Sequence, residues 1–404
     1  MKRTLTTALA AMMLCSLLHA ETTETAAADK ETKKPKKEVK YNEQGEIIKT
    51  GLNFGPLPVV AFDADRGFQY GALLNIYNFG DGKNYPNPNS TWYIEASAYT
   101  GGTWNLYLNY DNKQIFDNVR LSVCTKYANE AALDFYGFNG YQSNYDMKLV
   151  GDYVTFSNDK AGEKLLKKYE NKGKLPKGFY RYGRDLVKAK IDFTGEILKN
   201  FYWEAGYNLS WTKTQDFDPS GYSVFAGINP GQEYTGASLF GLYKDWGIIP
   251  ENEANGGLTS SIRLGLMYDS RNVENNPTKG IWAEAHIIAA PKWLGTAHEN
   301  YKYCATFRHY VPIVKNDILT FAYRLNYEGN FGDDAPYYVL PYITVMGSNY
   351  DRDGMGGYRT IRGIMRNRVQ GLDMASYNAE ARWRFARFTM GNQNIALGLN
   401  CFSD

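Results

Sequence analysis

The chain carries little net charge and, beyond its first residues, no long apolar run. Its formal net charge is +2 over 404 residues, so bulk charge does not favour nucleic acid as a partner. The absence of an 18-residue apolar run after the N-terminus excludes a membrane-spanning helix. Soluble all-β proteins and membrane β-barrels both remain compatible with this composition, because strands that alternate apolar and polar residues are invisible to hydropathy.

Signatures of catalysis and of metal binding are also missing. The sequence contains neither G-x-S-x-G nor H-E-x-x-H, and its four histidines are scattered. Only Cys124, Cys304 and Cys401 follow the N-terminal segment, and their wide spacing fits neither a disulfide framework nor a zinc site. We therefore expect no enzyme activity, no cofactor and no metal.

The N-terminal 50 residues are predicted to lie outside the folded domain. Lys2 and Arg3 precede a largely apolar stretch that ends near Leu18, which is typical of a secretory signal peptide over residues 1–20. Residues 21–50 are polar and lysine-rich with almost no apolar pattern, which predicts a disordered linker. From residue 51 to residue 404 the sequence predicts strands throughout.

The predicted strands have one apolar and one polar face. In the segment 91–100, Trp92, Ile94 and Ala96 alternate with Tyr93 and Glu95, which places the two sets on opposite faces of a sheet. The same period of two recurs in residues 104–110, 119–126, 187–196, 203–211, 262–269, 321–328 and 377–385.

A soluble β-sandwich and an outer-membrane barrel both have such faces. Many of these strands reach ten residues, longer than the five or six usual in sandwiches, and the polar face carries charges of both signs, as a wet lumen requires. Together with the signal peptide, this favours an all-β transmembrane antiparallel barrel.

About 13 strands are expected to start near residues 53, 67, 91, 103, 118, 186, 201, 259, 281, 301, 318, 374 and 393. The connections alternate between short turns and long loops, the longest spanning about 128–185, 214–258 and 331–373, and such long loops are external in barrels of this type.

Three segments resemble the BamA/TamA family, the bacterial surface antigen barrels. "YDSRNVENNPTKGIWAEA" (268–285) is similar to a strand–turn–strand hairpin of the family, and "FYGFNG" (135–140) is similar to its early loop. "LPYITVMGSNYDRDGMGGYRTIRGI" (340–364) resembles its sixth external loop. The hairpin residues that carry the resemblance are Asp269, Arg271, Pro277 and Gly280.

In this family the sixth loop folds back into the lumen, and its arginine pairs with carboxylates of the inner wall. The matching tip here is "IRGI", with Arg362 and Gly363 in place and Ile364 where the family has Phe or Tyr. The resemblance implies that Arg362 pairs with Glu380 and Asp404. The alternation independently assigns both carboxylates to the polar face of their strands.

The chain also departs from the family, whose members carry periplasmic POTRA domains and 16 strands. Residues 21–50 are too short for a POTRA domain, and about three C-terminal strands are expected to be missing from this sequence. The resemblance implies an integral bacterial outer-membrane protein that inserts or translocates other proteins, with outer-membrane lipids and unfolded outer-membrane or secreted proteins as partners. The alternative is a plugged channel or a structural barrel without assembly activity.

Overall fold

The computed structural model describes the chain from Tyr41 onward as one compact unit. The described residues are 41–42, 46–63, 66–138, 140–156, 160, 163–164, 166–167, 177–217, 234–236, 238–314, 317–340, 342–347, 352–357, 359–391 and 393–404. The predicted signal peptide and residues 21–40 of the predicted linker lie outside them. No helix in this described part is long and apolar enough to cross a membrane.

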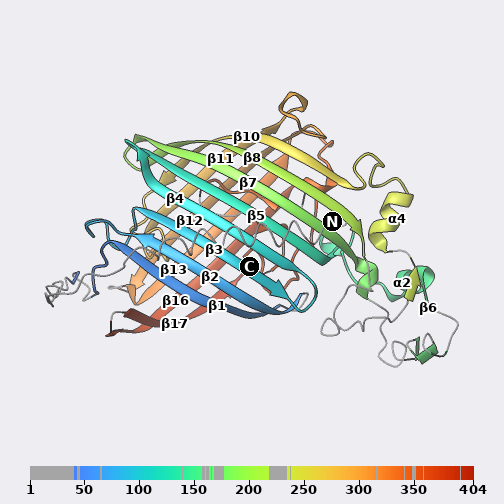
Figure 1. The fold of residues 1–404 in the computed structure, drawn as a ribbon, viewed down its shortest axis with the longest axis horizontal. Helices are drawn as coiled ribbons and strands as arrows, with labels where there is room; N and C mark the ends of the chain where they lie inside the picture. The colour runs from blue at the N-terminus through green and yellow to red at the C-terminus, as the bar shows by residue number, and fades with distance from the viewer. Residues whose placement is uncertain are drawn as a thin grey trace, which may run out of the picture. The chain divides into compact units, whose positions relative to one another are not determined.

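Thirteen strands form a single antiparallel sheet in which each strand pairs with its neighbours along the chain. They are β1 (Leu52–Asp63), β2 (Gly67–Asn78), β3 (Ser90–Tyr99), β4 (Trp104–Phe116), β5 (Val119–Asp134), β7 (Arg181–Leu198), β8 (Phe201–Asp216), β10 (Gly256–Asp269), β11 (Gly280–Ala290), β12 (Asn300–Val314), β13 (Leu319–Asn330), β16 (Met374–Met390) and β17 (Gln393–Ser403). The sheet curls so that β1–β5 pass in front of β12–β17 (Figure 1). The predicted number and order of strands are confirmed.

The two faces of the sheet differ as the alternation predicts. Strand β10 pairs with β8 on one side and with β11 on the other. Its Leu264 and Leu266 are about half exposed, whereas its Arg263 is buried. Apolar side chains that remain exposed on long strands fit contact with lipid, and the charged residues of the other face line the lumen. The lumen face of the sheet is therefore mainly polar.

The largest apolar core lies among the long loops at one end of the sheet. Aromatic residues from the β5–β7, β8–β10 and β13–β16 connections pack there, with Phe135 in edge-to-face contact with both Phe240 and Tyr243. Its buried members are Leu133, Phe135, Tyr136, Val150, Val154, Phe179, Tyr180, Tyr182, Leu239, Phe240, Leu242, Tyr243, Ile249, Tyr337, Tyr338, Val339 and Leu340. This cluster ties three loops together into a cap.

Short helices and strands support the cap, which corrects the prediction of strands throughout. The α-helices described in full are α2 (Met147–Tyr153) and α4 (Leu239–Asp245), and they lie at the same end of the sheet as β6 (Figure 1). Asp146 caps α2 and Ser238 caps α4 by accepting hydrogen bonds from first-turn amides. Seven-residue helices are too short to show a helical period. The remaining small elements are the paired strands β6 (Val154–Phe156) and β9 (Tyr234–Gly236), the paired strands β14 (Tyr342–Ile343) and β15 (Arg352–Asp353), and 3-10 turns at Gly140–Gln142, Lys177–Tyr180, Lys292–Leu294 and Tyr337–Val339.

Strand β7 begins at Arg181, five residues before its predicted start near 186. Residues 181–184 are all buried, because this end of the strand lies next to the cap and has both faces covered. A strand covered on both faces shows no period of two, so the sequence pattern appears only further along β7.

Candidate functional site

The loop between β13 and β16, residues 331–373, is held against the polar face of the sheet at three places. Its first part joins the cap through Tyr337 and Tyr338. The segment 344–347 contacts strands on the lumen face, and the basic stretch 359–368 contacts β5, β13, β16 and β17. The predicted folding of this loop into the lumen is confirmed.

Arg362 lies between the two carboxylates that the resemblance assigns to it. Its Nη1 is 2.7 Å from Glu380 Oε1, and its Nε is 2.7 Å from Asp404 Oδ2. Its Nη2 also donates to Asp404 Oδ1, and its backbone N–H donates to Asp404 Oδ2 at 2.8 Å. The guanidinium therefore binds Asp404 with two parallel hydrogen bonds, the geometry to which its planar fork is suited.

Two further contacts orient this group. The guanidinium carbon lies 3.7 Å from the centre of the Phe402 ring, within cation–π range. Glu380 also accepts a hydrogen bond from Arg382 Nε at 2.7 Å, so it is shared by two arginines. The hydrogen bond to Asp404, followed by the one to Glu380, raises the pKa of Arg362 despite partial desolvation, which keeps the cation charged at all accessible pH values.

The shape of the loop tip depends on glycine and on an internal hydroxyl. Thr360 Oγ1 accepts from the Gly356 N–H at 2.9 Å and donates to the Gly356 carbonyl at 2.6 Å. Gly356 has φ +115°, and a Cβ there would lie 1.9 Å from the Met365 carbonyl oxygen, so no other residue fits. Ile364 packs against a small apolar cluster that includes Ile361. An aliphatic residue thus packs where the family has an aromatic ring.

A second anchor holds the backbone of residues 344–347, and sequence reasoning missed it. Glu328 Oε2 accepts from the Thr344 N–H at 2.7 Å, and Glu284 Oε1 accepts from the Met346 N–H at 3.1 Å. Asp192 Oδ2 accepts from the Gly347 N–H at 2.9 Å. Three carboxylates on three strands, β13, β11 and β7, thus each bind one amide of this segment. We call residues 344–347 the clamped segment.

Two cationic groups bind one carbonyl of the same segment. Lys190 Nζ donates to the Val345 carbonyl at 3.0 Å, and Arg263 Nη2 donates to the same oxygen. The wall residues also neutralise one another, since Asp192 lies 3.5 Å from Lys190 and 3.6 Å from Arg263. Buried charges are tolerated when they are paired and hydrogen-bonded, and the clamped segment supplies part of that bonding. The alternation showed that these residues are on the polar face, but it carried no information on their partners.

The other arginines of the basic stretch also have partners. Arg366 Nη1 donates to Glu130, which also accepts from Arg184 Nε at 2.6 Å. Arg368 lies 3.5 Å from the centre of the Tyr136 ring. Arg366 and Arg368 therefore connect the loop to β5 and the cap, and this stretch is not a solvated surface loop.

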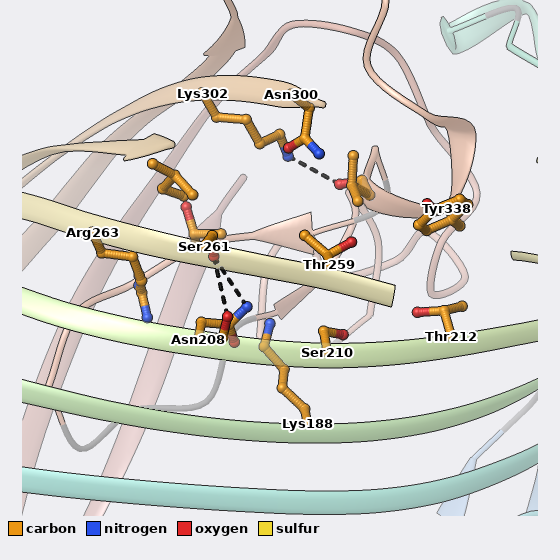
Figure 2. A pocket seen from close by; sticks show the side chains of 13 residues that line it. Lys188, Asn208, Ser210, Thr212, Thr259, Ser261, Arg263, Asn300, Lys302 and Tyr338 are labelled. Carbon is orange, nitrogen blue, oxygen red and sulfur yellow. Dashed lines mark hydrogen bonds between the residues drawn. The ribbon is translucent and has the colours of Figure 1, made fainter. Parts of the chain in front are cut away.

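A polar chamber lies between the first part of the loop and the wall. Its volume is about 50 Å³, and Figure 2 shows hydroxyl, amide and cationic side chains converging on it. The labelled residues that surround it are Lys188, Asn208, Ser210, Thr212, Thr259, Ser261, Arg263, Asn300, Lys302 and Tyr338. Tyr338 joins this chamber to the cap, and burial raises its pKa to about 12. A cavity of this size and polarity holds a few water molecules.

The predicted hairpin residues lie in the turn between β10 and β11, at the opposite end of the sheet from the cap. Arg271 Nε and Nη2 bind the Asp269 carboxylate at 2.9 and 2.6 Å. Gly280 has φ +104°, and a Cβ there would lie 2.3 Å from the Ser270 carbonyl oxygen. Pro277 is buried. Three of the four matched residues therefore have a visible role in shaping the turn.

This turn reaches the strands β4 and β5 through Glu274. Its carboxylate lies 3.0 Å from Lys113 Nζ and 3.1 Å from Arg120 Nη1, while Arg120 also binds Asp111 at 2.7 Å. Burial alone would raise the pKa of Glu274, but Arg120 and Lys113 outweigh it and lower the pKa to about 2. Glu274 is therefore an ionised bridge from the turn to the facing wall.

The geometry of the sheet and loop agrees with one protein family. A family model described as the Omp85 superfamily domain matches residues 117–404, which is more than half of the chain. The chain belongs to the Omp85 superfamily. It is accordingly an outer-membrane barrel protein of bacteria.

Similar solved structures include BamA from Haemophilus ducreyi lacking POTRA domains 1–3, with 15% identity, a TM-score of 0.42, and coverage of 87% of this chain and 57% of that chain. CdiB from Escherichia coli has 8% identity and a TM-score of 0.46, with coverage of 85% and 49%. CdiB from Acinetobacter baumannii has 14% identity and a TM-score of 0.39, with coverage of 84% and 47%. The chain thus spans about half the length of these structures. Among curated proteins, no sequence matches it.

Proposed function

We propose that this protein inserts or translocates other proteins at the outer membrane, with unfolded outer-membrane or secreted proteins as its substrates. The observation that carries the proposal is the Omp85 superfamily match over residues 117–404. The position of Arg362 between Glu380 and Asp404 supports it, because it gives the loop a defined resting place inside the lumen. We call this arginine and its two carboxylates the latch.

The first strand offers a second line of support, since a protein of this type would admit substrates beside β1. Gly51 exchanges two backbone hydrogen bonds with the end of β2, donating to Gly80 and accepting from Phe79. Backbone groups alternate sides along a strand, so even-numbered residues of β1 direct theirs away from β2. Pro56 and Pro58 are both even-numbered, and proline has no N–H to donate. The outer edge of β1 therefore lacks two donors near its middle, which favours an edge that opens easily.

Depletion of the protein from its own cells tests the proposed role. We expect the amounts of other folded outer-membrane barrels, or of secreted proteins, to fall after depletion, measured by quantitative proteomics of outer-membrane and medium fractions. Re-expression of the wild-type chain should restore them, and re-expression of an Arg362→Ala chain should do so less well. Unchanged levels of every barrel and secreted protein after full depletion would contradict an assembly or translocation role.

The polar chamber in Figure 2 favours one alternative, a plugged channel. Under that alternative, depletion leaves other barrels unchanged and alters solute uptake. Planar-bilayer recordings distinguish the two functions directly. A channel gives steady ion conductance, and the conductance increases when Arg362→Ala removes the latch. A protein that only inserts or translocates other proteins does not need to conduct ions steadily.

A further inference from the structure

An arginine-lined cavity lies on the lumen face of β12, β13 and β16, next to the loop tip. Its volume is about 190 Å³. Five guanidinium groups line it, those of Arg308, Arg324, Arg359, Arg362 and Arg382, and Glu380 is the one carboxylate in its lining. We call it the arginine cavity.

The carboxylates near the arginine cavity are already engaged. Glu380 binds both Arg362 and Arg382, each at 2.7 Å. Asp404, which lies just outside, binds Arg362 through both of its oxygens. Arg362 and Arg382 are therefore paired with carboxylates, and Glu380 and Asp404 are the carboxylates that pair with them.

Arg308 and Arg324 have no such compensation. They are directly opposite each other in the β12–β13 ladder, an arrangement that is destabilising for like charges. Arg324 donates to neutral groups, the Asn378 side-chain oxygen at 2.8 Å and the Arg359 carbonyl at 3.2 Å. Arg308 lies 4.2 Å from the centre of the Trp282 ring. Its Nε is buried and has no hydrogen-bond partner within the described part of the chain.

Within the described residues, neither guanidinium is in ion-pair contact with a carboxylate. Arg308 has a hydrogen bond with the side chain of Tyr310, a neutral group, and Glu284 and Asp404 influence the two arginines from further away. Glu284 is bound to His286 at 2.8 Å and to the Met346 N–H. A guanidinium cannot relieve the repulsion by losing its proton, since its intrinsic pKa exceeds 12. The opposed pair of Arg308 and Arg324 therefore provides a site for an anion from solution.

We propose that the arginine cavity binds a small oxyanion of the phosphate class. Guanidinium forks match the oxygen spacing of phosphate, and Arg308 and Arg324 present two of them side by side from adjacent strands. A water molecule occupies roughly 30 Å³ in the liquid, so a cavity of 190 Å³ holds a tetrahedral oxyanion with part of its hydration shell. The bound anion would bridge the two uncompensated arginines and stabilise the wall beside the loop tip.

Calorimetric titration of the folded full-length chain in detergent with inorganic phosphate tests the proposal, at constant ionic strength set with chloride. We expect saturable binding with a stoichiometry near one, and about tenfold or greater weakening in Arg308→Gln, because a charged bidentate contact is lost. Arg308→Lys should bind with intermediate affinity, since it keeps the charge and loses the fork. Glycerol phosphate, titrated in parallel, distinguishes the sources: binding by both ligands indicates phosphate esters, and binding by inorganic phosphate alone indicates the free ion.

Arg387→Gln is the matched control, because Arg387 is on β16 outside the cavity and lies near Asp317. It removes one positive charge and should bind phosphate as the wild type does. Heat-dependent migration on gels checks that each variant is folded before titration. Equal affinity of Arg308→Gln and wild type, an equal effect of Arg387→Gln, or no saturable heat with phosphate would each overturn the proposal.

Discussion

Lys190 Nζ lies 3.0 Å from the carbonyl oxygen of Val345 and joins β7 to a residue 155 positions further along the chain. This contact belongs to a set in which side chains of the wall bind the backbone of the clamped segment. Such contacts do not depend on which side chains the segment itself carries. The loop is therefore held inside the sheet in two different ways, by its backbone at residues 344–347 and by the side chains of Arg362, Arg366 and Arg368.

Replacing Lys190 by methionine tests the backbone anchor. The change removes one of the two donors to the Val345 carbonyl and one of the two cations beside Asp192, and we expect the free energy of unfolding to fall by about 1–3 kcal/mol. Urea titration of protein folded into liposomes measures it, and the loop should become more sensitive to protease. Lys188→Met, two residues earlier on β7 and facing the chamber of Figure 2, is the matched control with a smaller expected effect. Equal stability of Lys190→Met and wild type would show that the clamped segment is not held by this lysine.

Removing the latch should release the tip of the loop. Arg362→Ala leaves Glu380 and Asp404 facing each other without their shared cation. Breaking a buried pair costs about 3–5 kcal/mol, and we expect less here because the Arg362 side chain is 21% exposed and water screens it. Arg362→Lys should restore only part of the loss, since a point charge cannot form the two parallel bonds to Asp404.

Limited proteolysis and gel migration without heating measure this effect. Arg387→Ala is the control, because it removes an arginine of β16 that lies away from the loop tip and near Asp317. Cysteine pairs at 362 and 404, and at 362 and 380, should crosslink in the folded protein. The latch is excluded if neither pair crosslinks and Arg362→Ala matches the wild type in protease resistance.

The Glu274 bridge predicts a specific dependence of stability on pH. Its folded-state pKa of about 2 is below its ordinary value near 4.5, so its contribution is complete above pH 4.5 and is lost as the pH falls towards 2. The contribution at neutral pH is at most on the order of 3 kcal/mol, because one pKa unit corresponds to about 1.4 kcal/mol. Glu274→Gln should be less stable at pH 7 and should lose less stability between pH 4.5 and 2. Glu251→Gln, at an exposed loop position, should retain the pH dependence of the wild type. An identical acid profile for Glu274→Gln and wild type would refute the bridge.

The prolines of β1 predict a gain of stability when they are replaced. The double variant Pro56→Val and Pro58→Val restores two donors to the outer edge of β1, which is the first strand of the described sheet. Each hydrogen bond that these donors form with a strand closing the barrel contributes about 0.5–1.5 kcal/mol. We expect the folded protein to resist heating to a higher temperature and to lose activity in the depletion assay. Val59→Ile and Ala61→Val, which change side chains without adding donors, are the controls. A double variant that melts at or below the wild-type temperature would argue against donor loss as the reason for a weak edge.

The sheet could be predicted from the sequence because its lipid-facing residues follow a strict period of two over long stretches. Strands such as 262–269 and 377–385 could be predicted without knowing which strands they pair with, because strands that follow one another in the chain pair in antiparallel order. The pairing of Arg362 with Glu380 and Asp404 was predicted from a family resemblance. The alternation added only that both carboxylates are on the polar face of their strands.

The cap and the clamped segment could not be predicted in the same way. Phe135 and Phe240 meet in the cap, although more than a hundred residues separate them and neither lies in a segment with a clear period. Asp192, Glu284 and Glu328 look alike in the sequence as polar-face acids. Only the folded arrangement shows that each binds a different amide of one short segment.

The clamped segment has a consequence for the order of events during folding. Its amide partners are on β7, β11 and β13, so its binding site does not exist until strands distant in the sequence have come together in one sheet. Bringing such distant groups together costs chain entropy before any contact is gained. Seating of the loop is therefore a late step, and a partly formed sheet passes through an unplugged stage in which its polar interior is open to water. The loop can bind to the wall only after β7, β11 and β13 have been assembled into one sheet.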